Sequence, residues 1–213
     1  MLRYEHGGDV YGNPHIALDF SVNVNPLGMP DGVKRALVSH LEEYTRYPDP
    51  QCRALRAALA ARYGLAPEQV LCGNGAADLI FRIAACLKPR RALAPAPTFS
   101  EYERAVRAFG GAMEMHPLSA ENEFILGEDF SASIAPGIEL VFLCTPNNPT
   151  GLLIPFQRIC HIVQACRAQG TFVVLDECFL GFTEGASMAG MLQAYPNLII
   201  LSAFTKLYAM AGL

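Results

Sequence analysis

Short apolar runs alternate along the chain with segments whose apolar residues recur at helical spacing. This pattern predicts strands at Gln69–Cys72, Ala92–Ala94, Ala112–His116, Ile138–Cys144, Phe172–Leu175 and Leu198–Leu201. It predicts helices from Pro30 to about Glu43, over Ala54–Tyr63, from the glycines at 73–75 to about Cys86, over Ser100–Phe109 and over Phe156–Ala168. Strands and helices in alternation predict an α/β fold, a three-layer α/β/α arrangement around a mostly parallel sheet.

The first thirty residues differ from the rest. Ile16–Phe20 is expected to be extended, and Asn23–Pro30 is rich in turn-forming residues. We therefore assign residues 1–30 to an N-terminal arm and residues 31–213 to one large domain. The chain stops at Leu213, soon after its last predicted strand, so we expect it to be part of a longer protein.

Composition narrows the function classes. The 213 residues are 52% hydrophobic and 17% charged, enough apolar material for a core. A formal charge of −4 and the lack of a dense basic run disfavour nucleic-acid binding. No apolar stretch approaches the roughly 18 residues of a membrane span, and the polar start does not resemble a signal peptide. We expect a cytoplasmic protein whose seven cysteines are reduced thiols, with no bound metal.

A glycine-containing turn, Gly73-Asn74-Gly75-Ala76-Ala77-Asp78, lies where a predicted strand meets a predicted helix. Glycines let the backbone approach an anion, and a helix N-terminus offers unpaired N–H groups, so the turn indicates a phosphate site. A nicotinamide-dinucleotide site is an alternative, although Asp78 occupies the third glycine position and Pro95 stands where a ribose-binding acid should fall. A turn that needs glycine only for its dihedral angles is another.

Four further features also follow predicted strands, where open α/β sheets bind ligands. Phe99 could stack on a flat heterocycle or belong to the core. In Thr145-Pro146-Asn147-Asn148-Pro149-Thr150-Gly151, two prolines flank two asparagines and can aim an amide at a ligand oxygen. Asp176 could meet a protonated pyridine nitrogen, and Lys206 could form a Schiff base. Together the five features offer the contacts that pyridoxal 5′-phosphate needs.

These motifs, in this order, resemble those of the fold-type I pyridoxal-phosphate enzymes of the aminotransferase class I/II family. The resemblance implies the large domain of that fold, with the C-terminal small domain missing. It makes Lys206 and Asp176 the catalytic residues, with Lys206 bonded to the cofactor and Asp176 paired with its ring nitrogen. The other implied cofactor contacts are Asn148 on the phenolic oxygen, Phe99 on the ring, Gly75, Ala76 and Thr205 on the phosphate, and Tyr47 on the phosphate of a neighbouring subunit in a homodimer.

Within the family, the sequence resembles the threonine-phosphate decarboxylases of cobalamin biosynthesis more closely than the histidinol-phosphate aminotransferases. The segments that favour the decarboxylases are 6–9, 19–28, 87–91, 142–146 and Phe179. By this resemblance, His6 and Asn23 bind or adjoin the phosphate of a phosphorylated amino acid or amine substrate, in an active site at the subunit interface. The expected reaction converts L-threonine O-3-phosphate to 1-amino-2-propanol O-phosphate.

Two alternatives stay open. One is amino transfer from histidinol phosphate to 2-oxoglutarate, and the other is a non-catalytic module that binds the cofactor. The family's phosphate-gripping arginine and its small domain would follow Leu213, so we expect the 213-residue chain by itself to bind the cofactor weakly and to lack turnover.

Overall fold

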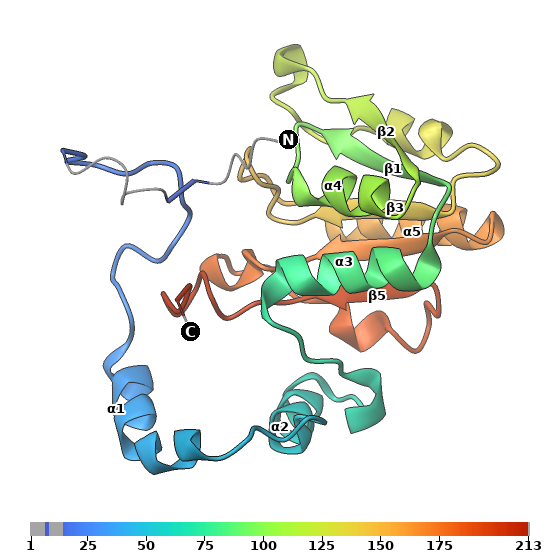
Figure 1. Cartoon of the computed structure of the whole chain (residues 1–213). Helices are drawn as coiled ribbons and strands as arrows, with labels where there is room; N and C mark the ends of the chain where they lie inside the picture. The colour runs from blue at the N-terminus through green and yellow to red at the C-terminus, as the bar shows by residue number, and fades with distance from the viewer. Residues whose placement is uncertain (1–6, 9–14, 213) are drawn as a thin grey trace. The chain divides into compact units, whose positions relative to one another are not determined.

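The computed structural model of the chain describes residues 7–8 and 15–212 (Figure 1). The chain forms two compact units. We call Arg46–Ala203 the sheet unit, and we call Met1–Thr45 together with Phe204–Leu213 the terminal unit.

The sheet unit is built on five parallel strands in the order β2-β1-β3-β4-β5. The strands are β1 (Arg91–Ala96), β2 (Ala112–Pro117), β3 (Leu140–Cys144), β4 (Phe172–Asp176) and β5 (Leu198–Leu201). From β1 the chain first adds β2 on one side and then β3 on the other. The strand order therefore reverses between β1 and β3, and such a switch point opens a crevice at the carboxyl ends of the strands.

Three long helices cover the two faces of the sheet (Figure 1). They are α3 (Gly75–Leu87), α4 (Glu101–Ala108) and α5 (Phe156–Ala168). Alternate residues of β3 face opposite cores: Phe142 packs with residues of α3 and α4, whereas Val141 and Leu143 pack with residues of α5. All of β3 is buried, as expected for a central parallel strand. The predicted three-layer α/β/α class is confirmed.

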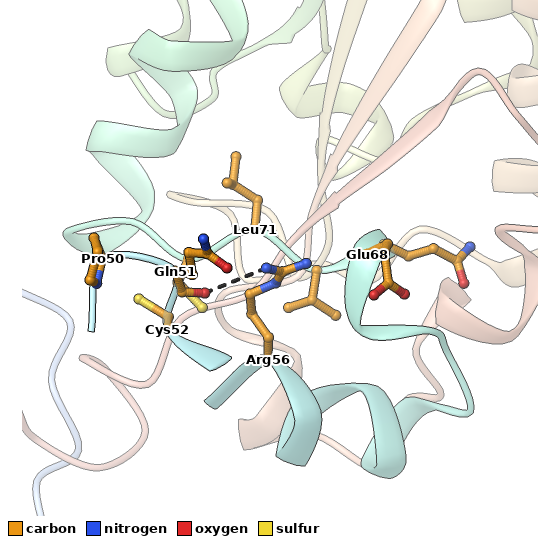
Figure 2. A pocket seen from close by; sticks show the side chains of 9 residues that line it. Pro50, Gln51, Cys52, Arg56, Glu68 and Leu71 are labelled. Atoms are coloured by element: carbon orange, nitrogen blue, oxygen red, sulfur yellow. Dashed lines mark hydrogen bonds between the residues drawn. The ribbon is translucent and has the colours of Figure 1, made fainter. Parts of the chain in front are cut away.

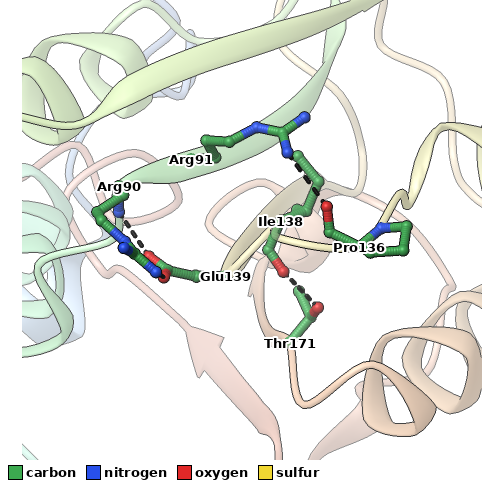
Figure 3. Close-up of polar contacts among 6 residues, drawn as sticks. All are labelled: Arg90, Arg91, Pro136, Ile138, Glu139 and Thr171. Atoms are coloured by element: carbon green, nitrogen blue, oxygen red, sulfur yellow. Dashed lines mark hydrogen bonds and ion pairs between the residues drawn. The ribbon is translucent and has the colours of Figure 1, made fainter.

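Polar side chains join the amino ends of the strands (Figure 3). The Arg90 backbone amide and guanidinium donate to the Glu139 carboxyl at 2.6–3.2 Å, and these contacts lower the pKa of Glu139. The Arg91 guanidinium donates to the Pro136 carbonyl, and the buried Thr171 hydroxyl donates to the Ile138 carbonyl at 2.6 Å. Side chains at this edge serve to fasten strands together, which leaves the carboxyl ends for ligand chemistry.

One prediction about the segment before α3 is wrong. Gln69–Cys72 is not a strand: Pro67–Gln69 forms the 3-10 helix η2, and Leu71 is 70% exposed, so no strand of the described residues covers it. Helix α2 spans Arg53–Tyr63, within one residue of its predicted bounds. The Asp49 carboxyl accepts from the amide of Arg53, the first residue of this helix, at 2.9 Å.

The remaining 3-10 helices of the sheet unit lie in connections. They are η3 (Ala120–Asn122), η4 (Glu128–Ser133), η5 (Leu180–Phe182) and η6 (Met188–Met191).

In the terminal unit, helix α1 spans Asp31–Ser39 and the 3-10 helix η1 spans Leu41–Thr45. The helix predicted up to Glu43 is therefore split, with tighter winding at its C-terminal end. The residues of Ile16–Phe20 adopt no regular structure and are exposed. Asn25 connects the two chain segments of the unit: its backbone amide donates to the Lys206 carbonyl at 3.0 Å, and its side chain donates to the Leu207 carbonyl at 2.8 Å.

All seven cysteines are free, and three of them are buried: Cys144, Cys166 and Cys178. Over residues 7–8 and 15–212, no helix is long and apolar enough to cross a membrane. The same residues hold no cluster of three His, Cys, Asp or Glu side chains that could bind a metal ion.

We predict that Phe142→Ala lowers the free energy of unfolding by about 3–5 kcal/mol, because it leaves a cavity under a fully buried ring. Phe156→Ala is the matched control. Phe156 is the first residue of α5 and is 47% exposed, so its loss should cost about 1 kcal/mol or less. Urea unfolding measures both, and equal losses would contradict this assignment of the core.

Candidate functional site

Asp176 is the last residue of β4 and is only 4% exposed. Alternation along the strand puts it on the same face as Val174, which packs with residues of α3 and α4. One carboxyl oxygen accepts from the Tyr102 hydroxyl at 2.7 Å, and the other accepts from the Cys178 amide at 2.9 Å. A carboxylate has about four acceptor positions, so these two bonds leave capacity for a further donor such as a pyridinium nitrogen.

Tyr102 is fully buried on α4. Its ring stacks on Phe142 with centroids 4.7 Å apart, and Phe99 meets its edge at 5.6 Å. Burial, with the adjacent Asp176 carboxylate, raises the pKa of Tyr102 well above its usual value, so its hydroxyl keeps its proton and donates to Asp176. The contact between Tyr102 and Asp176 is not predicted from the sequence, although a tyrosine three residues after Phe99 on a predicted helix is a signal for it.

Cys144 is the buried last residue of β3. Its thiol donates to the Pro146 carbonyl at 3.2 Å, and burial raises the pKa of the thiol to about 12. The same thiol lies near the Tyr102 hydroxyl and the Asn148 backbone amide. The Asn148 side chain is half-buried in the loop after β3. Phe99, Asn148 and Asp176 thus follow the carboxyl ends of three strands, and their roles as ring-stacking residue, oxygen ligand and nitrogen ligand stay predictions.

Glu177 follows Asp176 but has a different role. Burial raises the pKa of Glu177, although its carboxyl accepts from the Ser187 hydroxyl and the Met188 amide. These bonds join the end of β4 to the connection before β5, so the Glu177 carboxyl has a structural role.

The glycine turn precedes α3 as predicted. Gly75 has a φ of +78°, and a Cβ at this position would meet nothing within 4 Å. The Gly75 amide donates to the Gly73 carbonyl, and the Asn74 amide donates to the Asp78 carboxyl. The next N–H groups, beginning at Ala76, have no acceptor within a regular helix. Open space in front of a helix N-terminus suits a phosphate.

Asp78 does not face a ligand. It also accepts from Arg82 at 2.9 Å, and the bonds from Arg82 and Asn74 lower the pKa of Asp78. Because residues 15–74, all of them described, form no strand before the turn, the nicotinamide-dinucleotide alternative loses the context it requires.

A cavity of about 360 Å³ lies beside the segment that leads to this turn (Figure 2). Pro50, Gln51, Cys52, Arg56, Glu68 and Leu71 are among its lining residues. The Arg56 guanidinium is already bound to the Pro67 carbonyl at 2.7 and 3.0 Å and reaches the Gln51 carbonyl at 3.5 Å. The cavity contains none of the predicted cofactor contacts.

Tyr47, also in the sheet unit, has a fully exposed side chain. This exposure leaves its hydroxyl accessible to another molecule, as its predicted role toward a neighbouring subunit requires.

The other predicted site residues belong to the terminal unit. The chain has three lysines, Lys34, Lys88 and Lys206. Lys34 and Lys88 are exposed, whereas Lys206 is half-buried in a turn that Asn25 holds. Thr205 is half-buried beside it, and its carbonyl accepts from the Met210 amide. Asn23 is exposed, and His6 lies outside the described residues.

The sequence profile of the family "Aminotransferase class I and II" matches residues 15–213. The chain belongs to this family. It is 37% identical to a threonine-phosphate decarboxylase of Salmonella typhimurium, covering all of this chain and 61% of that protein. A histidinol-phosphate aminotransferase of Chlorobium phaeovibrioides is 33% identical, with 96% of this chain and 57% of that protein covered. The chain thus spans about three-fifths of the length of these curated relatives.

Solved structures agree on the fold. The L-threonine-O-3-phosphate decarboxylase of Porphyromonas gingivalis matches 90% of this chain and 56% of its own, with a TM-score of 0.80 and 27% identity. The aspartate aminotransferase of Thermus thermophilus has a TM-score of 0.82 at 21% identity, which shows the fold alone. The family resemblance and the pyridoxal-phosphate cofactor predicted from the sequence are confirmed. The residues described above fit that cofactor: a buried carboxyl with spare acceptor capacity, a stacking ring and an open helix N-terminus.

We predict that Tyr102→Phe lowers the free energy of unfolding at neutral pH by about 1.5–3 kcal/mol, because it leaves a carboxyl oxygen of Asp176 buried without its donor. Tyr63→Phe is the control, since that half-buried tyrosine makes no hydroxyl hydrogen bond within the described part of the chain.

The difference between wild type and Tyr102→Phe should shrink above about pH 10, where the unfolded tyrosine ionises but the folded one keeps its proton. A raised pKa adds stability below the unfolded value and loses it as the pH rises. Urea unfolding at several pH values measures this, and a difference that stays constant would show that the hydroxyl of Tyr102 does not sense Asp176.

Proposed function

We propose that this chain is the cofactor-binding region of a pyridoxal-phosphate enzyme that decarboxylates L-threonine O-3-phosphate to 1-amino-2-propanol O-phosphate, a step of cobalamin biosynthesis. The observation that carries the proposal is the buried carboxyl of Asp176, held at the carboxyl end of β4 by the Tyr102 hydroxyl and the Cys178 amide. The relative from Salmonella typhimurium supports the decarboxylase assignment within the family.

We assign each predicted residue a role toward the cofactor. Lys206 bonds the cofactor and carries protons, and Asp176 holds the proton on the ring nitrogen. Pyridoxal phosphate, when bound, supplies an electron sink for the electron pair left at the substrate's α-carbon. The remaining cofactor contacts are Phe99 on the ring, Asn148 on the phenolic oxygen, Gly75, Ala76 and Thr205 on the phosphate, and Tyr47 on the phosphate of the partner subunit in a homodimer.

Substrate specificity is assigned to the N-terminal arm. We propose that Asn23 and His6 bind or adjoin the substrate's phosphate. Asn23 has an exposed side chain that is available for such a contact.

Amino transfer from histidinol phosphate to 2-oxoglutarate is the second candidate. Relatives named histidinol-phosphate aminotransferase are 32–35% identical over similar lengths, which favours it as the alternative. The two reactions use the same cofactor contacts and differ in which bond at the α-carbon stands perpendicular to the ring.

We predict that Lys206→Ala abolishes the visible absorption of the lysine-bound cofactor while the far-ultraviolet circular dichroism of the protein is unchanged. Lys34→Ala and Lys88→Ala are the controls, because both side chains are exposed. Each control should keep the absorption of wild type. Loss of the absorption in Lys88→Ala, together with unchanged absorption in Lys206→Ala, would show that Lys206 is not the lysine that bonds the cofactor.

We predict that the full-length protein releases CO2 from O-phospho-threonine and forms no glutamate from histidinol phosphate and 2-oxoglutarate. The two products are measured in parallel on one preparation loaded with pyridoxal phosphate. Glutamate without CO2 would establish the aminotransferase in place of the decarboxylase.

A further inference from the structure

Asn147 precedes the asparagine assigned to the cofactor, and both ends of its amide group are hydrogen-bonded. Its Oδ1 accepts from the Thr98 hydroxyl at 2.9 Å, and its Nδ2 donates to the Pro97 carbonyl and the Thr150 hydroxyl, both at 3.0 Å. The residue is 8% exposed. Three of the four bonding positions of the amide are therefore satisfied inside the protein, so this side chain has little capacity left for a ligand.

Two of these bonds cross from the loop after β3 to the loop after β1. The direct ladder between these strands is short: it pairs Ala92 with Leu140 and Leu93 with Val141, although the strands continue to Ala96 and Cys144. The ladder between β3 and β4 runs on to the pair Cys144 and Asp176. At the switch point of the sheet, the strand pairing of β1 with β3 stops before their carboxyl ends. There the Asn147 amide joins the loops that follow the two strands.

The backbone of the loop after β3 is bonded to itself. The Asn147 backbone amide donates to the Leu152 carbonyl at 2.8 Å, and the Gly151 amide donates to the Asn147 carbonyl at 2.7 Å. These bonds stay within the segment after β3 and do not reach the loop after β1. The bonds of the Asn147 side chain to Thr98 and Pro97 are the ones that cross to that loop.

The two connected loops carry the residue assigned to the face of the cofactor ring and the residue assigned to its phenolic oxygen. Phe99 directly follows Thr98, and Asn148 directly follows Asn147. We propose that Asn147 is a positioning residue: by joining the loops after β1 and β3, it sets the stacking side chain and the oxygen ligand at one fixed separation. This inference rests on the proposed function, since it concerns the same cofactor site.

The test compares Asn147→Ala, Thr98→Val and their double variant with Thr145→Val. Thr145 lies in the same loop and its hydroxyl accepts from the Ile154 amide at 3.0 Å, but this bond does not reach the loop after β1. Thr145→Val is therefore a matched control that loosens one loop without disconnecting the two. Thr98→Val removes one cross-loop bond and keeps the asparagine, so it remains informative if Asn147→Ala does not fold.

Pyridoxal 5′-phosphate is titrated into the full-length form of each protein, because the 213-residue chain alone is expected to bind it weakly. The induced circular dichroism of the cofactor in the visible band is recorded with its dissociation constant. The cofactor is achiral, so this signal reports its fixed orientation. We expect Asn147→Ala to bind about tenfold more weakly and to lose most of the signal per bound cofactor. Thr98→Val should change both in the same direction by a smaller factor, and the double variant should add nothing to Asn147→Ala. Thr145→Val should keep the wild-type signal even where urea unfolding shows that it is less stable.

An Asn147→Ala signal equal to that of Thr145→Val would overturn the positioning role, and so would additive losses in the double variant. Failure of wild type to develop a visible band would contradict the proposed function itself, so the two failures are distinguishable.

Discussion

The hydrogen bond between Tyr102 and Asp176 is the contact on which the rest of the site depends. An acidic side chain that is 4% exposed is unfavourable unless donors surround it, and the protein supplies one from α4 and one from the backbone after β4. Tyr102 can do this because Phe142 fixes its ring within the core between the sheet and α4. Tyr102 and Phe142 therefore pack one face of the sheet and, by the same packing, hold the donor that Asp176 needs at the edge of the sheet.

The two edges of the sheet are used differently. At the amino ends, charged and polar side chains such as Arg90 and Glu139 bond to each other and fasten neighbouring strands. At the carboxyl ends, Phe99 and Asn148 lie on loops that are held by other residues, among them Tyr102 and Cys144. Because neighbouring residues hold these loops in place, the side chains of Phe99 and Asn148 stay available for a ligand.

Much of the fold could be predicted from the sequence because its elements are local and strongly patterned. Phe156–Ala168 and Leu198–Leu201 match the predicted bounds, since each has uninterrupted apolar spacing and clear ends. The segment Gln69–Cys72 was predicted as a strand from its apolar content, but a strand needs a partner and this one has none. In the site, Asp176 could be predicted from its place after a buried run. The roles of Tyr102 and Asn147 could not, because their partners are 74 and 49 residues away in the chain.

The short ladder between β1 and β3 has a mechanical consequence. It divides the five strands into a ribbon of two and a ribbon of three, joined by two residue pairs at one end and by an asparagine amide at the other. Packing must therefore join the two ribbons where backbone pairing stops. Ala94 of β1 and Phe142 of β3 belong to one buried core, which also contains Tyr102.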